Sequence, residues 1–164
     1  MICFLLRHAD AGDSTLWKGD DDLRQLTALG QAQAADIAAL LARAAHQPGA
    51  VVTSPRVRAE QTARAVADAL GLGVRLDARL AGRLDSDALR EIVAAMEQPC
   101  LVGHEPDISE VLAELLGVTA LPMPKATLAV LDIERFEPGG AQLMGFVPPS
   151  LLTGNGVTPA CAAR

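Results

Sequence analysis

The sequence predicts a three-layer α/β/α sandwich with a mainly parallel central sheet, and two features of the chain lead to this prediction. Short apolar runs alternate with longer segments in which apolar residues recur every three or four positions, the order of a parallel sheet with helical crossovers. Near the C-terminal end, strand-like runs over 127–133 and 141–147 flank Pro138-Gly139-Gly140 and predict an antiparallel hairpin. Residues 1–164 are expected to fold as one domain.

The first strand is expected over residues 2–6, a run of five apolar residues that leads directly into Arg7 and His8. The segment from Gly12 to Arg24 is polar and acidic and is predicted to be a loop. Thr27 is a suitable N-cap for the helix that follows. The buried stripe of this helix is expected at apolar residues with helical spacing, namely Ile37, Leu40, Leu41 and Ala44.

A second strand is expected over residues 50–53. Ser54-Pro55 directly after it predicts a helix start, with serine as the N-cap and proline at the first helical position. Apolar residues at helical spacing continue this helix to Gly71, a suitable C-terminal cap. A short third strand is expected over 74–76.

The next helix is expected over 84–98, capped by Ser86. A strand follows at 100–102, and it leads into another helix that is expected to begin with Pro106 as its first helical residue and to close at Gly117. The order of elements therefore alternates between strand and helix until the C-terminal hairpin.

Composition excludes several classes of function. The net charge is −6 and no basic stripe is present, so we expect no nucleic-acid partner. No apolar run approaches a membrane span or a signal peptide, and the three cysteines are scattered, which predicts a soluble cytoplasmic protein without a membrane partner. Residues 148–164 contain prolines and glycines and little periodicity, so they are expected to form an irregular tail that partly covers the sheet.

Arginine and histidine side chains follow three of the predicted parallel strands. Arg7 and His8 end the first strand, Arg56 and Arg58 follow the second, and His104 follows the strand at 100–102. Because the carboxyl ends of parallel strands meet at one edge of the sheet, these side chains are expected to lie together. Arginine forks bind phosphoryl oxygens and a neutral imidazole can attack phosphorus, so the cluster suits phosphoryl transfer. We expect no metal and no cofactor.

Three motifs in this order carry a family resemblance: Arg7-His8, Ser54-Pro-x-x-Arg58-Ala59-x-Gln61-Thr62, and Gly103-His104-x-Pro106. Together they resemble the histidine phosphatase superfamily and, more closely, its short SixA-type phosphohistidine phosphatase branch. The resemblance runs from residue 1 to about residue 147. It implies a phosphoglycerate mutase-like fold and catalysis through a phosphohistidine intermediate without a metal.

The resemblance implies a role for each matching residue. His8 matches the nucleophile, and Arg7 and Arg58 match the arginines that bind the phosphoryl group. His104 matches the second histidine that contacts that group. Water would then hydrolyse the phosphorylated His8 and release inorganic phosphate.

Two further arginines, Arg24 and Arg56, stand near positions of the family pattern. Arg58 is preferred to Arg56 because the family's arginine directly precedes an alanine, and Arg56 is expected to point to solvent. Arg24 stands in Leu23-Arg24-Gln25-Leu26-Thr27, which resembles an Arg-Pro-Leu-Thr run of this branch. Arg24 is expected either to reach the substrate or to brace its loop, and the sequence leaves both alternatives open.

The chain departs from the larger members of the superfamily in its acidic residues. Those members supply a glutamate after the third strand as general acid for an alcohol leaving group, whereas no glutamate lies between Asp77 and Arg90. A phosphoramidate needs no such acid, because its P–N bond is labile and solvent can protonate the leaving imidazole. With no large insertion to close over it, the site is expected to be open and shallow, which suits a phosphohistidine on the surface of another protein.

Two alternatives stay open from sequence. One is a phosphatase for a small phosphomonoester, with Asp85 or Glu105 as the general acid. The other is a phosphate- or phosphoprotein-binding module with little turnover, against which the pair of histidines argues. The identity of the phosphorylated substrate and the oligomeric state do not follow from the residues.

Overall fold

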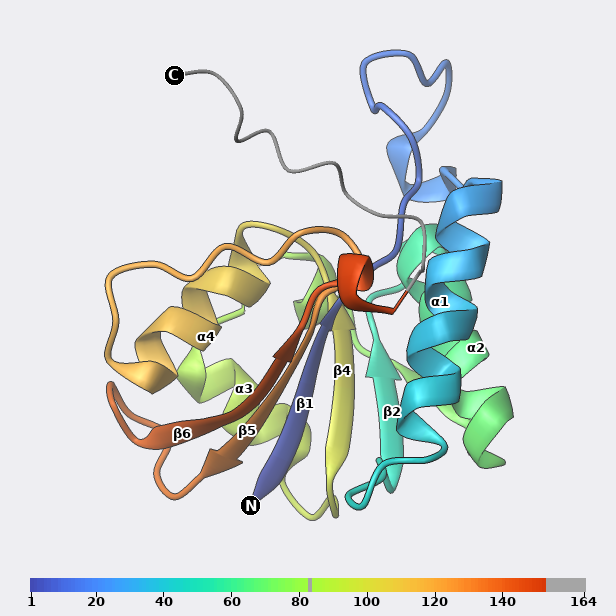
Figure 1. Ribbon diagram of the computed structural model, residues 1–164. Helices are drawn as coiled ribbons and strands as arrows, with labels where there is room; N and C mark the ends of the chain where they lie inside the picture. The colour runs from blue at the N-terminus through green and yellow to red at the C-terminus, as the bar shows by residue number, and fades with distance from the viewer. Residues whose placement is uncertain (83, 153–164) are drawn as a thin grey trace, which may run out of the picture.

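The computed structural model describes residues 1–82 and 84–152, which surround one six-stranded sheet in the order β3-β2-β4-β1-β5-β6. Strands β1 to β4 run parallel, while β5 pairs antiparallel with both β1 and β6 (Figure 1). The predicted hairpin and the predicted fold class are confirmed. The strands are β1 (Ile2–Arg7), β2 (Ala50–Thr53), β3 (Val74–Leu76), β4 (Pro99–Gly103), β5 (Leu128–Ile133) and β6 (Ala141–Val147).

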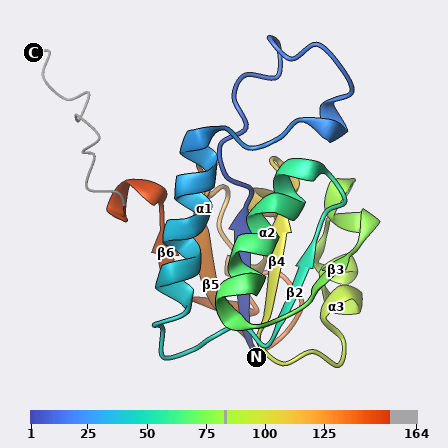
Figure 2. The same cartoon turned by 90° about the vertical axis from the view of Figure 1, so that its right-hand side faces the viewer.

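Helices cover both faces of this sheet. Helices α1 (Ala28–Leu41) and α2 (Val57–Leu70) lie on one face, as the side view in Figure 2 shows. Helices α3 (Ser86–Val93) and α4 (Asp107–Leu116) lie on the other. Three short 3-10 helices complete the described part, η1 (Asp21–Leu23), η2 (Ala78–Ala81) and η3 (Pro149–Leu151).

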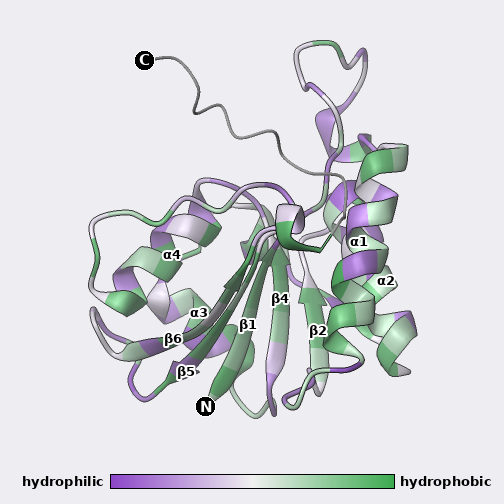
Figure 3. Ribbon diagram, viewed as in Figure 1, coloured by the Kyte–Doolittle hydropathy of each residue, from purple (hydrophilic) through white to green (hydrophobic). Residues whose placement is uncertain are grey.

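Strand β1 connects the two halves of the core because its side chains alternate between the faces. Phe4 and Leu6 belong to the apolar cluster beneath α1 and α2, whereas Cys3 and Leu5 belong to the cluster beneath α3 and α4. Hydrophobic residues run through the central strands in Figure 3, as expected for strands that are buried on both faces. The buried strand therefore fixes the position at which His8 leaves the sheet.

The predicted N-cap of α1 is confirmed, and it also holds the loop after β1. Thr27 Oγ1 accepts a hydrogen bond from the Gly30 amide at 3.0 Å, while the Thr27 amide donates to the carbonyl of Asp10. A Cβ atom on Gly30 would lie 1.9 Å from that same carbonyl oxygen. Glycine is needed here because the loop backbone packs directly on the first turn of the helix.

The starts of two helices differ from the sequence predictions. Helix α2 begins at Val57 and not at Pro55, because Ser54 does not cap it; the Ser54 hydroxyl lies 2.8 Å from Nε2 of His104. Helix α4 begins at Asp107, and Pro106 is its N-cap and not its first helical residue. The predicted caps at the other ends, Gly71 and Gly117, are confirmed by their left-handed backbone.

Helix α3 is shorter than predicted and is capped one residue earlier. It ends at Val93, and the following turn places Ala95 at a φ of 64°. Asp85, not Ser86, is the N-cap, since its carboxylate accepts a hydrogen bond from the Ala88 amide at 2.9 Å. The apolar spacing beyond residue 93 belongs to this turn and not to a helix.

At the C-terminal end, the predicted irregular tail begins with η3, which packs against α1. The rest of that prediction, residues 153–164, lies outside the described residues. Within the described part of the chain, no helix has the length and apolar character that a membrane crossing requires.

Candidate active site

The carboxyl ends of β1, β2 and β4 meet at one cavity, as their parallel arrangement predicts. The cavity is open to solvent and has a volume of about 510 Å³. All five predicted site residues lie on its wall. The complete lining is Arg7, His8, Gly12, Asp13, Ser14, Arg24, Arg56, Arg58, His104, Glu105 and Lys125.

His8 is buried, and its two partners define its tautomer. Nδ1 lies 2.8 Å from the carbonyl oxygen of Ala9, which can only accept, so Nδ1 carries the proton. Nε2 accepts a hydrogen bond from Nε of Arg58 at 3.3 Å and therefore holds a lone pair. Burial, aided by the nearby cations, lowers the pKa of His8 to about 3, so the ring is neutral at physiological pH.

His104 faces His8, with the two ring centroids 4.9 Å apart. The Ser54 hydroxyl accepts a hydrogen bond from the Arg56 amide, and its oxygen also lies 2.8 Å from Nε2 of His104. Nδ1 of His104 is a buried atom that has no hydrogen-bond partner among the described residues. Burial first, and the neighbouring His8 second, lower the pKa of His104 to about 2.

Arg7 and Arg58 supply positive charge beside the histidines. Arg7 donates to the carbonyl of Met123 at 2.7 Å and lies 3.9 Å from the Glu105 carboxylate. Arg58 is almost fully buried, and its terminal nitrogens donate to the backbone and the carboxylate of Asp21. Burial lowers the pKa of both arginines, although a guanidinium stays charged at neutral pH.

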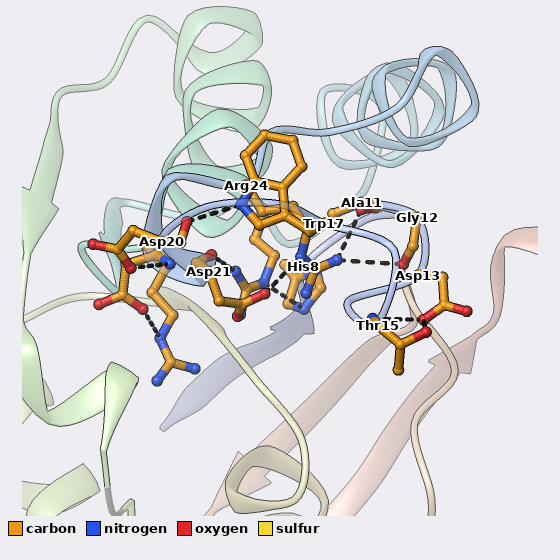
Figure 4. A network of polar contacts seen from close by, with 12 residues as sticks. His8, Ala11, Gly12, Asp13, Thr15, Trp17, Asp20, Asp21 and Arg24 are labelled. Carbon is orange, nitrogen blue, oxygen red and sulfur yellow. Dashed lines mark hydrogen bonds and ion pairs between the residues drawn. The ribbon is translucent and has the colours of Figure 1, made fainter.

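Arg24 lines the cavity and also braces its loop. One terminal nitrogen donates to the carbonyls of Ala11 and Gly12, at 2.8 Å and 3.3 Å, and Nε donates to Asp21 at 2.8 Å. Figure 4 shows these contacts beside His8. The bracing alternative therefore has direct contacts in its support, and a part in substrate binding stays a prediction.

The expectation that Arg56 points to solvent is wrong. Its guanidinium lines the cavity and forms an ion pair with Asp22 at 2.8 Å, so the acidic loop holds this side chain toward the site. Sequence reasoning also missed Lys125, whose ammonium donates to Asp10 at 2.7 Å and to the carbonyl of Gly12 at 3.0 Å. Lys125 precedes an antiparallel strand, where the rule about parallel strand ends gives no signal.

The two carboxylates considered as general acids are both engaged elsewhere. Asp85 caps α3 and does not line the cavity. Glu105 does line it, but Oε1 of Glu105 accepts from the Ser109 hydroxyl and from the Met123 amide. Residues 1–82 and 84–152 contain no cluster of three or more His, Cys, Asp or Glu side chains that could bind a metal ion.

Solved structures resemble this fold over most of its length. A protein assigned as the phosphohistidine phosphatase SixA of Agrobacterium tumefaciens is 27% identical, with a TM-score of 0.73 over 90% of this chain and 97% of that chain. The protein histidine phosphatase SixA complexed with tungstate is 25% identical, with a TM-score of 0.80 over 93% and 100%. A mycobacterial glucosyl-3-phosphoglycerate phosphatase complexed with VO3, at 23% identity, shares the fold with a TM-score of 0.70 over 90% and 99%.

Comparison with curated proteins gives no match. The model of the histidine phosphatase superfamily (branch 1), in contrast, matches residues 3–84, which are half of the chain. The matched stretch contains Arg7, His8 and Arg58, and the cavity adds His104 from β4 to the same site. The chain belongs to the histidine phosphatase superfamily, branch 1.

Proposed function

We propose that this protein is a metal-independent phosphatase that hydrolyses phosphohistidine on another protein through a phosphoryl group carried by His8. The observation that carries the proposal is the pairing of His8 with Arg58: Nε2 of His8 is unprotonated, buried and directed at the Arg58 guanidinium. An imidazole in this state is a nucleophile and needs no base to activate it. Tungstate, an analogue of phosphate, is bound by a SixA protein with the same fold.

In the proposed reaction, Nε2 of His8 forms a bond to phosphorus while the P–N bond to the substrate histidine breaks. Arg7 and Arg58 stabilise the charge of the equatorial oxygens, and the Nδ1 proton of His104 donates to one of them. The departing imidazole takes a proton from solvent. Water then attacks phosphorus, regenerates His8 and releases inorganic phosphate.

The carboxylates of the site support a substrate whose leaving group needs no strong acid. Glu105 is held by hydrogen bonds from Ser109 and Met123. Hydrogen bonds from Thr15 lower the pKa of Asp13, the other acid that lines the cavity, so Asp13 is ionised at neutral pH. Both groups are poor donors to an alkoxide, whereas a leaving imidazole is protonated by water.

A second candidate is a phosphatase for a small phosphomonoester. The cavity volume of about 510 Å³ favours it, because this volume is within the range of pockets that enclose small ligands. Glu105 is the carboxylate that would then have to act as the acid. We also propose a role in signal transduction, which the family resemblance implies, and a cytoplasmic location, which the sequence predicts.

The experiment compares two substrates under metal-free conditions at neutral pH: a protein phosphorylated on histidine, and p-nitrophenyl phosphate. The proposal predicts release of phosphate from the protein at a kcat/KM at least about a hundredfold higher than for the ester. Preference for the ester would contradict it and favour the phosphomonoesterase. Binding of phosphate without turnover of either substrate would contradict both and favour a binding module.

A further inference from the structure

The acidic loop of residues 20–22 lies against the arginines of the site, and its three carboxylates have different hydrogen-bond and ion-pair partners. Asp20 caps η1 and accepts a hydrogen bond from the Asp22 amide at 3.0 Å. Asp22 is exposed and pairs with Arg56. Asp21 alone of the three contacts two arginines at once, and the close view in Figure 4 shows it beside His8.

Both oxygens of the Asp21 carboxylate are used in this bridge. Oδ1 accepts from Nε of Arg24 at 2.8 Å, and Oδ2 accepts from a terminal nitrogen of Arg58 at 3.0 Å. The backbone carbonyl of Asp21 accepts from the other terminal nitrogen of Arg58 at 2.7 Å. Asp21 therefore accepts hydrogen bonds from both terminal nitrogens of the Arg58 guanidinium, one through its backbone carbonyl and one through its carboxylate.

These two hydrogen bonds determine the orientation of the whole Arg58 guanidinium. The group is planar and rigid, so fixing both terminal nitrogens also fixes the direction of Nε. That Nε is the atom that donates to Nε2 of His8. Of the five N–H groups, three are then engaged and two are left for phosphoryl oxygens.

Asp21 does not compete for the space of the substrate. It is absent from the residues that line the cavity, although Arg24 and Arg58 are both among them. The carboxylate thus approaches the two arginines from outside the cavity. An acid that imitated a bound phosphate would instead occupy the cavity itself.

The bridge also offsets repulsion between like charges. Arg24 and Arg58 are held close together with Arg7 and Lys125 on the same cavity. The hydrogen bond from Arg24, followed by the charge of Arg58, lowers the pKa of Asp21, so its carboxylate is ionised at neutral pH. Asp21 is the counter-charge that lets Arg58 remain buried before a phosphoryl group arrives.

We infer that Asp21 is a positioning residue of this site: its carboxylate orients Arg58 toward Nε2 of His8 and holds part of the arginine charge until the phosphoryl group binds. The inference rests on the proposed phosphatase function for its kinetic consequence alone. The geometric and anion-binding consequences exist whichever phosphorylated substrate the site accepts.

The test uses the full chain with Asp21→Asn, with Asp20→Asn as the matched control. Asn still caps η1 at position 20, and this change removes the same charge from the same loop without touching an arginine. Because the Asp21 side chain is 46% exposed, both variants are expected to fold, which circular dichroism checks. Asp21→Glu, which keeps the charge, is the conservative variant.

Three quantities are measured: kcat with the phosphorylated protein, the Kd for inorganic phosphate by calorimetry, and the ¹⁵N shift of His8 Nε2. Asp21→Asn is expected to lower kcat at least tenfold and to shift the ¹⁵N signal of His8 Nε2. The Kd for phosphate is expected to fall at least threefold, because the carboxylate no longer neutralises part of the arginine charge. Asp20→Asn should change none of them, and Asp21→Glu should restore kcat to within about fivefold.

An unchanged phosphate Kd and an unchanged Nε2 signal in Asp21→Asn would overturn the inference, with or without turnover. Equal weakening of kcat and phosphate binding would also overturn it, since that result describes a general loss of structure. Absence of turnover in the unmodified protein would contradict the proposed function, and the binding and spectroscopic measurements would still decide the role of Asp21.

Discussion

Nε of Arg58 lies 3.3 Å from Nε2 of His8, and the hydrogen bond between them joins the first turn of α2 to the end of β1. The bond is possible only while Nε2 is unprotonated, because a guanidinium has no acceptor. The Ala9 carbonyl on Nδ1 enforces the same tautomer from the other side of the ring. In the proposed mechanism, this buried pair specifies both the reactive atom and the charge beside it.

Arg58→Lys is expected to lower kcat by about 10²- to 10³-fold, because lysine keeps the charge but loses the planar fork that contacts both His8 and the transferred oxygens. Steady-state kinetics with the phosphorylated protein measure this loss. Arg64→Lys is the control, since Arg64 lies on the same helix and its exposed side chain pairs with Glu60 on the helix surface. Equal activity of the two variants would contradict the proposed role of Arg58 in catalysis.

Ser54→Ala is expected to lower kcat about tenfold with little change in fold. In the proposed mechanism, the Ser54 hydroxyl, 2.8 Å from Nε2 of His104, donates to that nitrogen and so keeps the proton of the ring on Nδ1. Without that donor, the proton is free to move to Nε2, and Nδ1 no longer donates to the phosphoryl group. Kinetics together with a thermal melt check the prediction, and unchanged kcat in a folded variant would refute the assigned tautomer.

Both active-site histidines should remain neutral from pH 8 to pH 5. Their pKa values of about 3 and about 2 lie below the ordinary value, so the unfolded chain binds more protons than the folded chain below about pH 6.5. The free energy of unfolding should therefore fall with decreasing pH, by up to about 1.4 kcal/mol per pH unit for each histidine.

Imidazole NMR signals measured between pH 8 and pH 5 test the protonation states, and urea unfolding at pH 7 and pH 5.5 tests the stability. The lower limit of pH 5.5 keeps Asp10, Asp13 and Asp21 ionised, because hydrogen bonds and nearby cations hold the pKa of each below its usual value. Titration of His8 or His104 near pH 6.5 would show that the ring is solvated, and the stability should then be flat over this range.

Gly30→Ala is expected to destabilise the protein by about 1–3 kcal/mol, although alanine favours helices elsewhere. The added methyl group would lie 1.9 Å from the Asp10 carbonyl oxygen, so the loop that follows His8 must move. Urea unfolding measures the change. Gly73→Ala is a useful comparison because nothing lies within 4 Å of a Cβ there, and equal stability of both variants would contradict the close packing.

Residues at the ends of parallel strands were predictable because their signals are local. Arg7 and His8 end an apolar run, and the loops after β2 and β4 carry Arg58 and His104. Thr27 likewise caps α1 through atoms three residues away, so sequence proximity is sufficient. Parallel topology then brings the strand ends to one edge without further information.

The remaining features depend on contacts between distant residues. The start of α2 lies later than predicted, and the Ser54 hydroxyl contacts His104, fifty positions along the chain. Asp21 and Lys125 reach the site through ion pairs with partners on other segments. Such pairings depend on the folded path of the loops, and no local pattern of residues predicts them.

Intact-protein mass spectrometry under non-acidic conditions, after the chain is mixed with a protein phosphorylated on histidine, tests the central claim most directly. The account predicts one phosphoryl group on the unmodified chain during turnover, located at His8, and neither this adduct nor phosphate release in His8→Ala. Phosphate release by His8→Ala at the unmodified rate, or an adduct at another residue, would contradict the role of His8 as the nucleophile.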